Sequence, residues 1–231
     1  MDSITKAIED YQNTLCKQID IIALRQRNPV AHKWKVTYQI LSNRETVAWR
    51  FVDILEQSWF LHSQSKPIGA RILLRSAIET ISLLIYQDKL IGDVITRKLS
   101  FLEFGEKVLA LMNGSKNEST TRTAINIVTI LKHCEKRYEG IEKIYNWLSE
   151  SAHPNYEGMR LSYSDTDPKT LITSFNNKTR ELYSGMQIDG TILSMSMFEN
   201  EYKHSEDLFL KLEVWLEAND VELEQYRAPP C

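Results

Sequence analysis

A histidine occupies the position at which a helix has to end, in the sequence SESAHPNY from Ser149 to Tyr156. Proline disfavours the α conformation in the residue before it, so the helix that contains Ile141, Tyr145 and Leu148 is predicted to end at or just before His153. The unpaired carbonyl groups at a helix C-terminus favour a protonated imidazole, and the pKa of an unperturbed histidine is already near neutral. His153 is therefore a candidate general acid or base, and the alternative is that it only caps its own helix.

A charged stripe on the predicted helix from Pro67 to about Leu90 is the second candidate. At about 100° per residue, Arg71, Arg75 and Glu79 fall together on this helix, and apolar side chains flank them on both sides. Arg75 and Glu79 are one turn apart and can form an ion pair. Charges in such surroundings either pair for structural reasons or face a site, and the sequence leaves both readings open.

Two segments carry a resemblance to a known family. RILLRSAIE, from Arg71 to Glu79, and YNWLSESAHPN, from Tyr145 to Asn155, resemble bacterial helical proteins of the HEPN superfamily. The resemblance covers roughly Trp34 to Tyr156. It implies an α-helical protein that dimerises through its helices. Members include metal-independent ribonucleases of toxin–antitoxin and anti-phage systems, and others bind without cutting.

The sequence departs from the nuclease motif of this superfamily. In that motif an arginine is followed, after four to six residues, by a histidine, whereas Asn146, Trp147 and Leu148 stand at the corresponding positions before His153. Only the histidine is carried over. A cation for the phosphate would have to come from another helix, and Arg75 is the candidate.

A ribonuclease mechanism assigns a role to each of these residues. His153 would act as base or acid, and Arg75 would bind the phosphate, because a guanidinium group matches phosphate bidentately. The supporting residues, which would orient Arg75 or contact the RNA, are Glu79, Arg71, Asn155 and Tyr156. This hypothesis requires a fold that brings Arg75 close to His153.

The alternative function is a non-catalytic helical interaction module that binds a protein or RNA partner. In this reading His153 shapes a corner, Arg75 and Glu79 brace the bundle, and an acidic C-terminal helix docks a basic partner. Under either reading we expect a homodimer.

No metal or cofactor is expected. The other histidines, at positions 32, 62, 133 and 204, show no zinc-ligand spacing with cysteines or carboxylates, and no glycine-rich phosphate-binding loop is present.

Composition predicts a protein without a membrane span. Of the 231 residues, 42% are hydrophobic and 26% are charged, and the most apolar stretch, residues 68–86, contains Arg71, Arg75 and Glu79. The N-terminus lacks the pattern of a signal peptide, and the three cysteines, at positions 16, 134 and 231, show no paired spacing. Together these features predict a cytoplasmic protein.

The charge is uneven along the chain. The net charge is −3, yet residues 199–231 hold nine of the 31 acidic residues and only three of the 28 basic ones. The first 198 residues are therefore mildly basic. A local basic groove for RNA is compatible with this distribution, and so is an ordinary solvated surface.

Helical periodicity predicts the elements that position the candidate residues. Helices are predicted over residues 3–27, 34–62, 67–90, 93–113, 119–138 and 140–152. After His153, strands at 159–163 and 171–175 are predicted to form a β-hairpin, 180–186 is a candidate third strand, and an acidic helix follows at about 190–218. The sequence thus predicts an all-α bundle of about six to seven helices, in one domain over residues 1–231, with a β-hairpin insertion at about 159–186.

Overall fold

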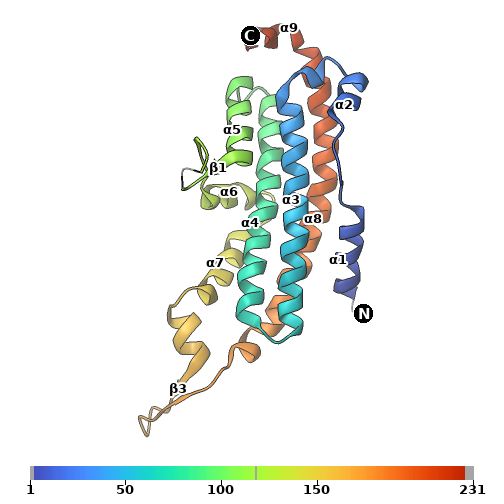
Figure 1. Ribbon diagram of the computed structural model, residues 1–231. Helices are drawn as coiled ribbons and strands as arrows, with labels where there is room; N and C mark the ends of the chain where they lie inside the picture. Colours follow the sequence, from blue (N-terminus) through green and yellow to red (C-terminus); the bar gives the residue numbers. More distant parts are fainter. Residues whose placement is uncertain (1–2, 118, 227–231) are drawn as a thin grey trace. The chain divides into compact units, whose positions relative to one another are not determined.

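The computed structural model describes residues 3–117 and 119–226, and helices make up most of this part of the chain (Figure 1). The α-helices are α1 (Ser3–Thr14), α2 (Ile21–Arg27), α3 (Lys35–Ser63), α4 (Pro67–Ile95), α5 (Phe101–Asn113), α6 (Ile127–Cys134), α7 (Ile141–Ala152), α8 (Thr179–Ala218) and α9 (Asp220–Leu223). Short helical segments are the 3-10 helices η1 (Ala31–Lys33) and η3 (Glu224–Tyr226) and the π-helix η2 (Tyr156–Leu161). The predicted all-α class is confirmed, and the described residues contain more helices than predicted.

Two pairs of short strands accompany the helices. Strands β1 (Gly114–Ser115) and β2 (Arg122–Thr123) pair in parallel. Strands β3 (Ser164–Thr166) and β4 (Thr173–Phe175) form an antiparallel hairpin inside the predicted insertion, but β3 begins only after the strand predicted at 159–163. No helix in the described ranges is both long enough and apolar enough to span a membrane.

The chain divides into two compact units. The described residues of unit 1 lie within Met1–Thr14, Trp49–Ile81 and Leu131–Phe198, and those of unit 2 within Leu15–Ala48, Ser82–Ile130 and Glu199–Cys231. Boundaries fall inside α3, α4, α6 and α8, so each of these helices contributes to both units. The expectation of a single domain stays a prediction.

Unit 1 is built around the apolar face that was predicted for α4. Leu74, Ala77, Ile78 and Ile81 are buried, as their helical spacing requires. From α3 and α8, the Phe51 and Phe198 rings stack with their centres 4.6 Å apart. The apolar face of α4 is thus buried in unit 1, and the stacked rings join α3 to α8.

Unit 2 contains one buried histidine, His32, that polar side chains surround. The His32 Nε2 atom lies 2.6 Å from Glu213 Oε1, and its Nδ1 atom lies 3.1 Å from Thr37 Oγ1. Arg27 also binds Glu213. Burial lowers the pKa of His32, and the charge of Glu213 opposes this effect.

Three predicted helix boundaries are wrong, and side-chain caps explain two of them. The helix expected at 3–27 is interrupted, because the Asp20 carboxylate accepts hydrogen bonds from the backbone of Ile22 and Ala23 and starts α2 there. The helix expected from Asp93 starts only after Ser100, whose capping box with Glu103 begins α5. The helix expected at 119–138 is shorter and follows the β1–β2 pair.

The segment after α7 also differs from the prediction. Residues 159–161 belong to η2 rather than to a strand, because the Asn155 side chain caps η2 by accepting a hydrogen bond from Gly158 N. The candidate third strand at 180–186 is wrong. Asn177 accepts hydrogen bonds from the backbone and side chain of Thr179, where α8 begins, so the predicted acidic helix starts well before residue 190.

Candidate functional site

Arg71 is the most deeply buried of the candidate residues. Its relative exposure is 0%, although it lies on the stripe that the sequence assigned to charged side chains. The guanidinium carbon lies 3.5 Å from the centre of the Trp147 ring and 4.4 Å from that of Tyr183. The group is therefore enclosed by aromatic rings from α7 and α8.

Hydrogen bonds join Arg71 to the last turn of α7. Its Nε donates to Ser151 Oγ, and its Nη2 donates to the Trp147 carbonyl oxygen at 2.8 Å. Among the described residues Nη1 has no hydrogen-bond partner and no carboxylate forms an ion pair with Arg71. Burial lowers the pKa of Arg71 to about 10, with the charges of Tyr183 and Glu157 opposing the shift, so the group stays protonated at neutral pH.

Arg75 is held by a second aromatic residue of α7. Its Nη2 donates to the Tyr145 hydroxyl at 2.6 Å, and the same hydroxyl donates to Glu79 Oε1 at 2.9 Å. Arg75 and Glu79 also form the predicted ion pair across one helical turn, at 3.2 Å. Burial raises the pKa of Tyr145, which keeps the hydroxyl able to donate. Arg75 and Glu79 therefore hold the Tyr145 hydroxyl in place, and they do not form an isolated ion pair in solvent.

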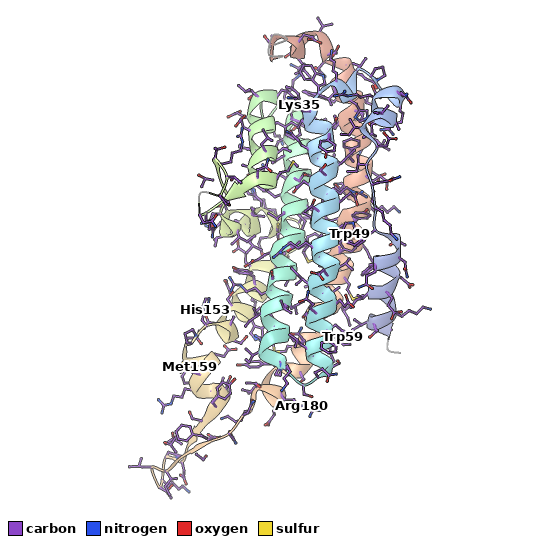
Figure 2. The ribbon with its side chains drawn as sticks, in the orientation of Figure 1. Lys35, Trp49, Trp59, His153, Met159 and Arg180 are labelled. Carbon is purple, nitrogen blue, oxygen red and sulfur yellow. The ribbon has the colours of Figure 1, made fainter. Side chains whose placement is uncertain are left out.

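His153 ends α7, as predicted. Its backbone is extended, with φ of −97° and ψ of 150°, and its N–H donates to Ser149 O at 3.2 Å. The ring is exposed and forms no hydrogen bond or ion pair with another described side chain. Figure 2 places His153 at the end of α7, close to Met159 of η2.

Asn155 and Tyr156 differ in what they contact. The Asn155 amide nitrogen donates to Glu150 Oε2 at 2.6 Å, and its oxygen caps η2, so this side chain is committed to the turn between α7 and η2. Tyr156 is 68% exposed. Of these two residues, Tyr156 is the one whose side chain is accessible to a partner.

The structure brings Arg75 to Tyr145 and Arg71 to the end of α7. Tyr145 precedes His153 by eight residues, which corresponds to about 12 Å along a helix. No hydrogen bond or ion pair between the His153 side chain and either arginine occurs within residues 3–117 and 119–226. The arginine next to the His153 corner is therefore Arg71, which the protein itself encloses.

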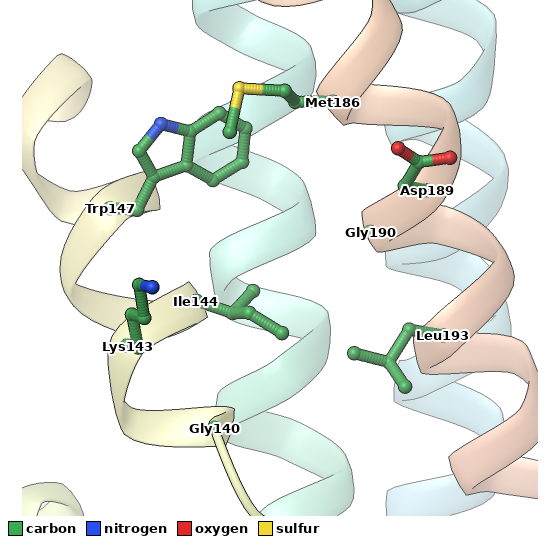
Figure 3. A pocket seen from close by; sticks show the side chains of 8 residues that line it. All are labelled: Gly140, Lys143, Ile144, Trp147, Met186, Asp189, Gly190 and Leu193. Atoms are coloured by element: carbon green, nitrogen blue, oxygen red, sulfur yellow. The ribbon is translucent and has the colours of Figure 1, made fainter.

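A pocket of about 440 Å³ lies between the first half of α7 and α8 (Figure 3). Its main lining side chains are Lys143, Ile144 and Trp147 of α7 and Met186, Asp189 and Leu193 of α8. Figure 3 shows Trp147 opposite Met186, and Ile144 opposite Leu193. Lys143 and Asp189 lie on opposite walls and form no ion pair with a described residue. The pocket is thus apolar inside with one charge of each sign on its rim.

Sequence reasoning missed the aromatic residues of the site. The sequence assigned no site role to Trp147 or Tyr145 and placed Tyr183 in a candidate strand, whereas all three contact the arginines. The spacing of Tyr145 and Trp147 on a helix gave no signal, because their partners come from α4, some 70 residues earlier.

The described residues contain no group of three or more histidine, cysteine or carboxylate side chains that could hold a metal ion. No family model, curated protein or solved structure matches this chain.

Proposed function

We propose that this chain is a HEPN-like, non-catalytic helical module that binds a protein partner. The proposal rests on one observation, which is that both candidate arginines bind side chains of unit 1 itself. Arg71 is enclosed between Trp147 and Tyr183, and Arg75 is bound to Tyr145 and Glu79. Their contacts fasten α7 to α4.

Phosphate binding needs a guanidinium group whose donors face the ligand. Two of the three nitrogens of Arg71 donate to α7, and the whole residue has no exposed surface. Arg75 is partly exposed, but a neighbouring carboxylate, Glu79, already neutralises it. The contacts of Arg71 and Arg75 therefore argue against a phosphate-binding role for either residue in RNA cleavage at His153.

An exposed apolar surface favours a protein partner. Leu171, Ile172 and Phe175, which we call the hairpin patch, are 80%, 66% and 80% exposed. Several exposed apolar side chains on one short segment favour an interaction site. The surrounding residues 156–180 contain four basic and three acidic side chains, so they lack the strong positive charge that RNA binding requires.

A cleavage assay tests the proposal. Purified protein is incubated with labelled mixed RNA in EDTA, beside a His153→Ala variant. We expect intact RNA in both reactions and equal melting temperatures, because the His153 ring is exposed and has no partner among the described side chains. Cleavage by the unmodified chain that is lost in the variant would refute it.

A metal-independent ribonuclease is the second candidate function, and one observation favours it. The His153 ring is accessible at a helix C-terminus, next to the exposed Tyr156. An accessible imidazole can act as a general acid or base towards a bound substrate. The same assay separates the two functions.

A further inference from the structure

The pocket between α7 and α8 lies beside the layer in which Arg71 separates the two helices. The Trp147 ring comes from α7 and the Tyr183 ring from α8, and the Arg71 guanidinium carbon lies 3.5 Å and 4.4 Å from their centres. This group is therefore a spacer between α7 and α8. Beyond the spacer, towards Gly140 on α7 and Leu193 on α8, the helices leave about 440 Å³ between them.

Each wall of the pocket is also held from behind by another helix. Arg71 of α4 binds α7 through its hydrogen bond to the buried Ser151 hydroxyl. Gln187 of α8 is fully buried, and its Nε2 donates to Ser58 Oγ of α3 at 3.0 Å. The walls cannot close on each other without breaking these buried hydrogen bonds, which is costly. The pocket is therefore preformed.

The lining of the pocket determines what can enter it. Its two charged side chains, Lys143 and Asp189, are exposed and lie on the rim, so a ligand that enters meets apolar groups. A polar group buried there would lose its hydrogen bonds to water without replacement. The buried part of a ligand is therefore apolar.

Trp147 and Met186 favour an aromatic ring over an aliphatic group. Because Arg71 stacks on the Trp147 ring and fixes it, a flat ligand can stack on the part that Arg71 leaves uncovered at little entropic cost. The Met186 thioether lies opposite this ring, and sulfur contacts with aromatic rings are favourable. An apolar cavity of about 150 Å³ holds one benzene molecule, so 440 Å³ has room for two fused rings.

We propose that the pocket between α7 and α8 binds a compact planar aromatic molecule of one or two fused rings, stacked on Trp147 and in contact with Met186. A polar substituent of this ligand lies at the rim, beside Lys143 or Asp189. The inference goes beyond the proposed function and does not rest on it, because neither a protein partner nor RNA takes part in the binding.

Isothermal titration calorimetry of the full chain with 2-naphthol tests the class of ligand. The comparison probe is decahydro-2-naphthol, which has the same fused skeleton and hydroxyl group but is saturated and not planar. We expect 2-naphthol to bind at one site per chain and about fivefold more tightly than the saturated probe, because only aromatic rings can stack on Trp147. No binding of 2-naphthol, or equal affinities for the two probes, would overturn the inference.

Two matched pairs of variants test the position of the site. Leu193→Trp fills the pocket, and Ile192→Trp adds the same side chain at an exposed position of α8 that does not line it. Met186→Ala removes the thioether, and Ile188→Ala truncates another exposed side chain of α8 outside the lining.

We expect the affinity for 2-naphthol to fall by roughly tenfold in Leu193→Trp and by about threefold in Met186→Ala, and to stay unchanged in both controls. Circular dichroism checks that each variant is folded. If Leu193→Trp does not fold, Met186→Ala decides, because it changes an exposed side chain. Unchanged affinity in Met186→Ala, or an equal loss in its control, would overturn the inference.

Discussion

Arg71 was a candidate supporting residue of the site, but its contacts give it a structural role. A buried cation without a paired carboxylate is costly. Here two aromatic faces and two hydrogen bonds to α7 offset that cost. The residue therefore joins α4, α7 and α8, and its charge serves the packing of unit 1.

Replacing Arg71 by lysine should lower the free energy of unfolding by about 2 kcal/mol, because an ammonium group cannot stack between the two rings or reach both acceptors. Urea unfolding followed by circular dichroism measures the change. The matched control, Arg75→Lys, should cost less than about 1 kcal/mol, since that ion pair is partly solvated. An Arg71→Lys protein as stable as the unmodified chain would contradict the structural role.

His32 should make stability depend on pH. Its pKa is lowered in the folded protein, mainly by burial, with Glu213 and Arg27 facing the ring. Between that lowered value and the ordinary value of about 6.5, the unfolded chain binds more protons, so the free energy of unfolding rises with pH. This contribution is complete above the ordinary pKa and is lost as pH falls from there through the folded pKa.

Urea unfolding between pH 5 and 8 measures this dependence, and a His32→Gln variant should show a flatter profile over the same range. If the unmodified protein instead became more stable as the pH fell below 6.5, the ion pair with Glu213 would outweigh burial.

At the scale of elements, the close contact between η2 and the end of α7 depends on Gly158. A Cβ at this position would overlap the His153 carbonyl oxygen and lie within about 3.3 Å of the Ser151 and Glu150 oxygens. Those oxygens belong to the backbone and cannot move aside easily. Gly158 therefore allows η2 to pack directly under the corner that carries His153.

A Gly158→Ala variant should be destabilised by about 2 kcal/mol. Gly185→Ala is the control, because a Cβ there meets nothing within 4 Å and lies in α8. The control should be stabilised by about 0.5 to 1 kcal/mol through helix propensity. Melting temperatures of the two variants check both signs, and equal melting temperatures would show that η2 does not pack as described.

The predictable elements are those whose signals are local. The apolar face of α4, the end of α7 before Pro154 and the Arg75–Glu79 pair follow from spacing or from a neighbouring proline, and all are observed. The start of α8 at Thr179 was not predicted, because Leu182 and Tyr183 are compatible with a strand and Gly185 disfavours a helix interior until α8 packs against its neighbours.

The environment of the candidate site could be predicted only in part. The sequence placed Arg71 and Arg75 on one stripe, but it could not say which arginine reaches the end of α7. That depends on the packing of α4 against α7, which brings Ser151 to Arg71 and Tyr145 to Arg75. The burial of Arg71 by Tyr183 depends on α8, which follows more than 100 residues later.

At the scale of the whole molecule, unit 1 contains the enclosed arginines, the pocket and the hairpin patch. The pocket and the hairpin patch favour binding, whereas the enclosed arginines argue against phosphate chemistry at His153. The proposals therefore treat the helices of unit 1 as a frame that presents one apolar hairpin to a partner and one apolar pocket to an aromatic ligand.

The central claim is that the arginines serve the fold rather than an RNA phosphate. Single-turnover incubation of labelled RNA with excess protein in EDTA tests it most directly, because even slow cleavage is then detected. We predict no fragments, with or without His153→Ala. Fragments ending in 2′,3′-cyclic phosphate that appear with the unmodified chain and vanish in the variant would contradict the claim and establish a ribonuclease.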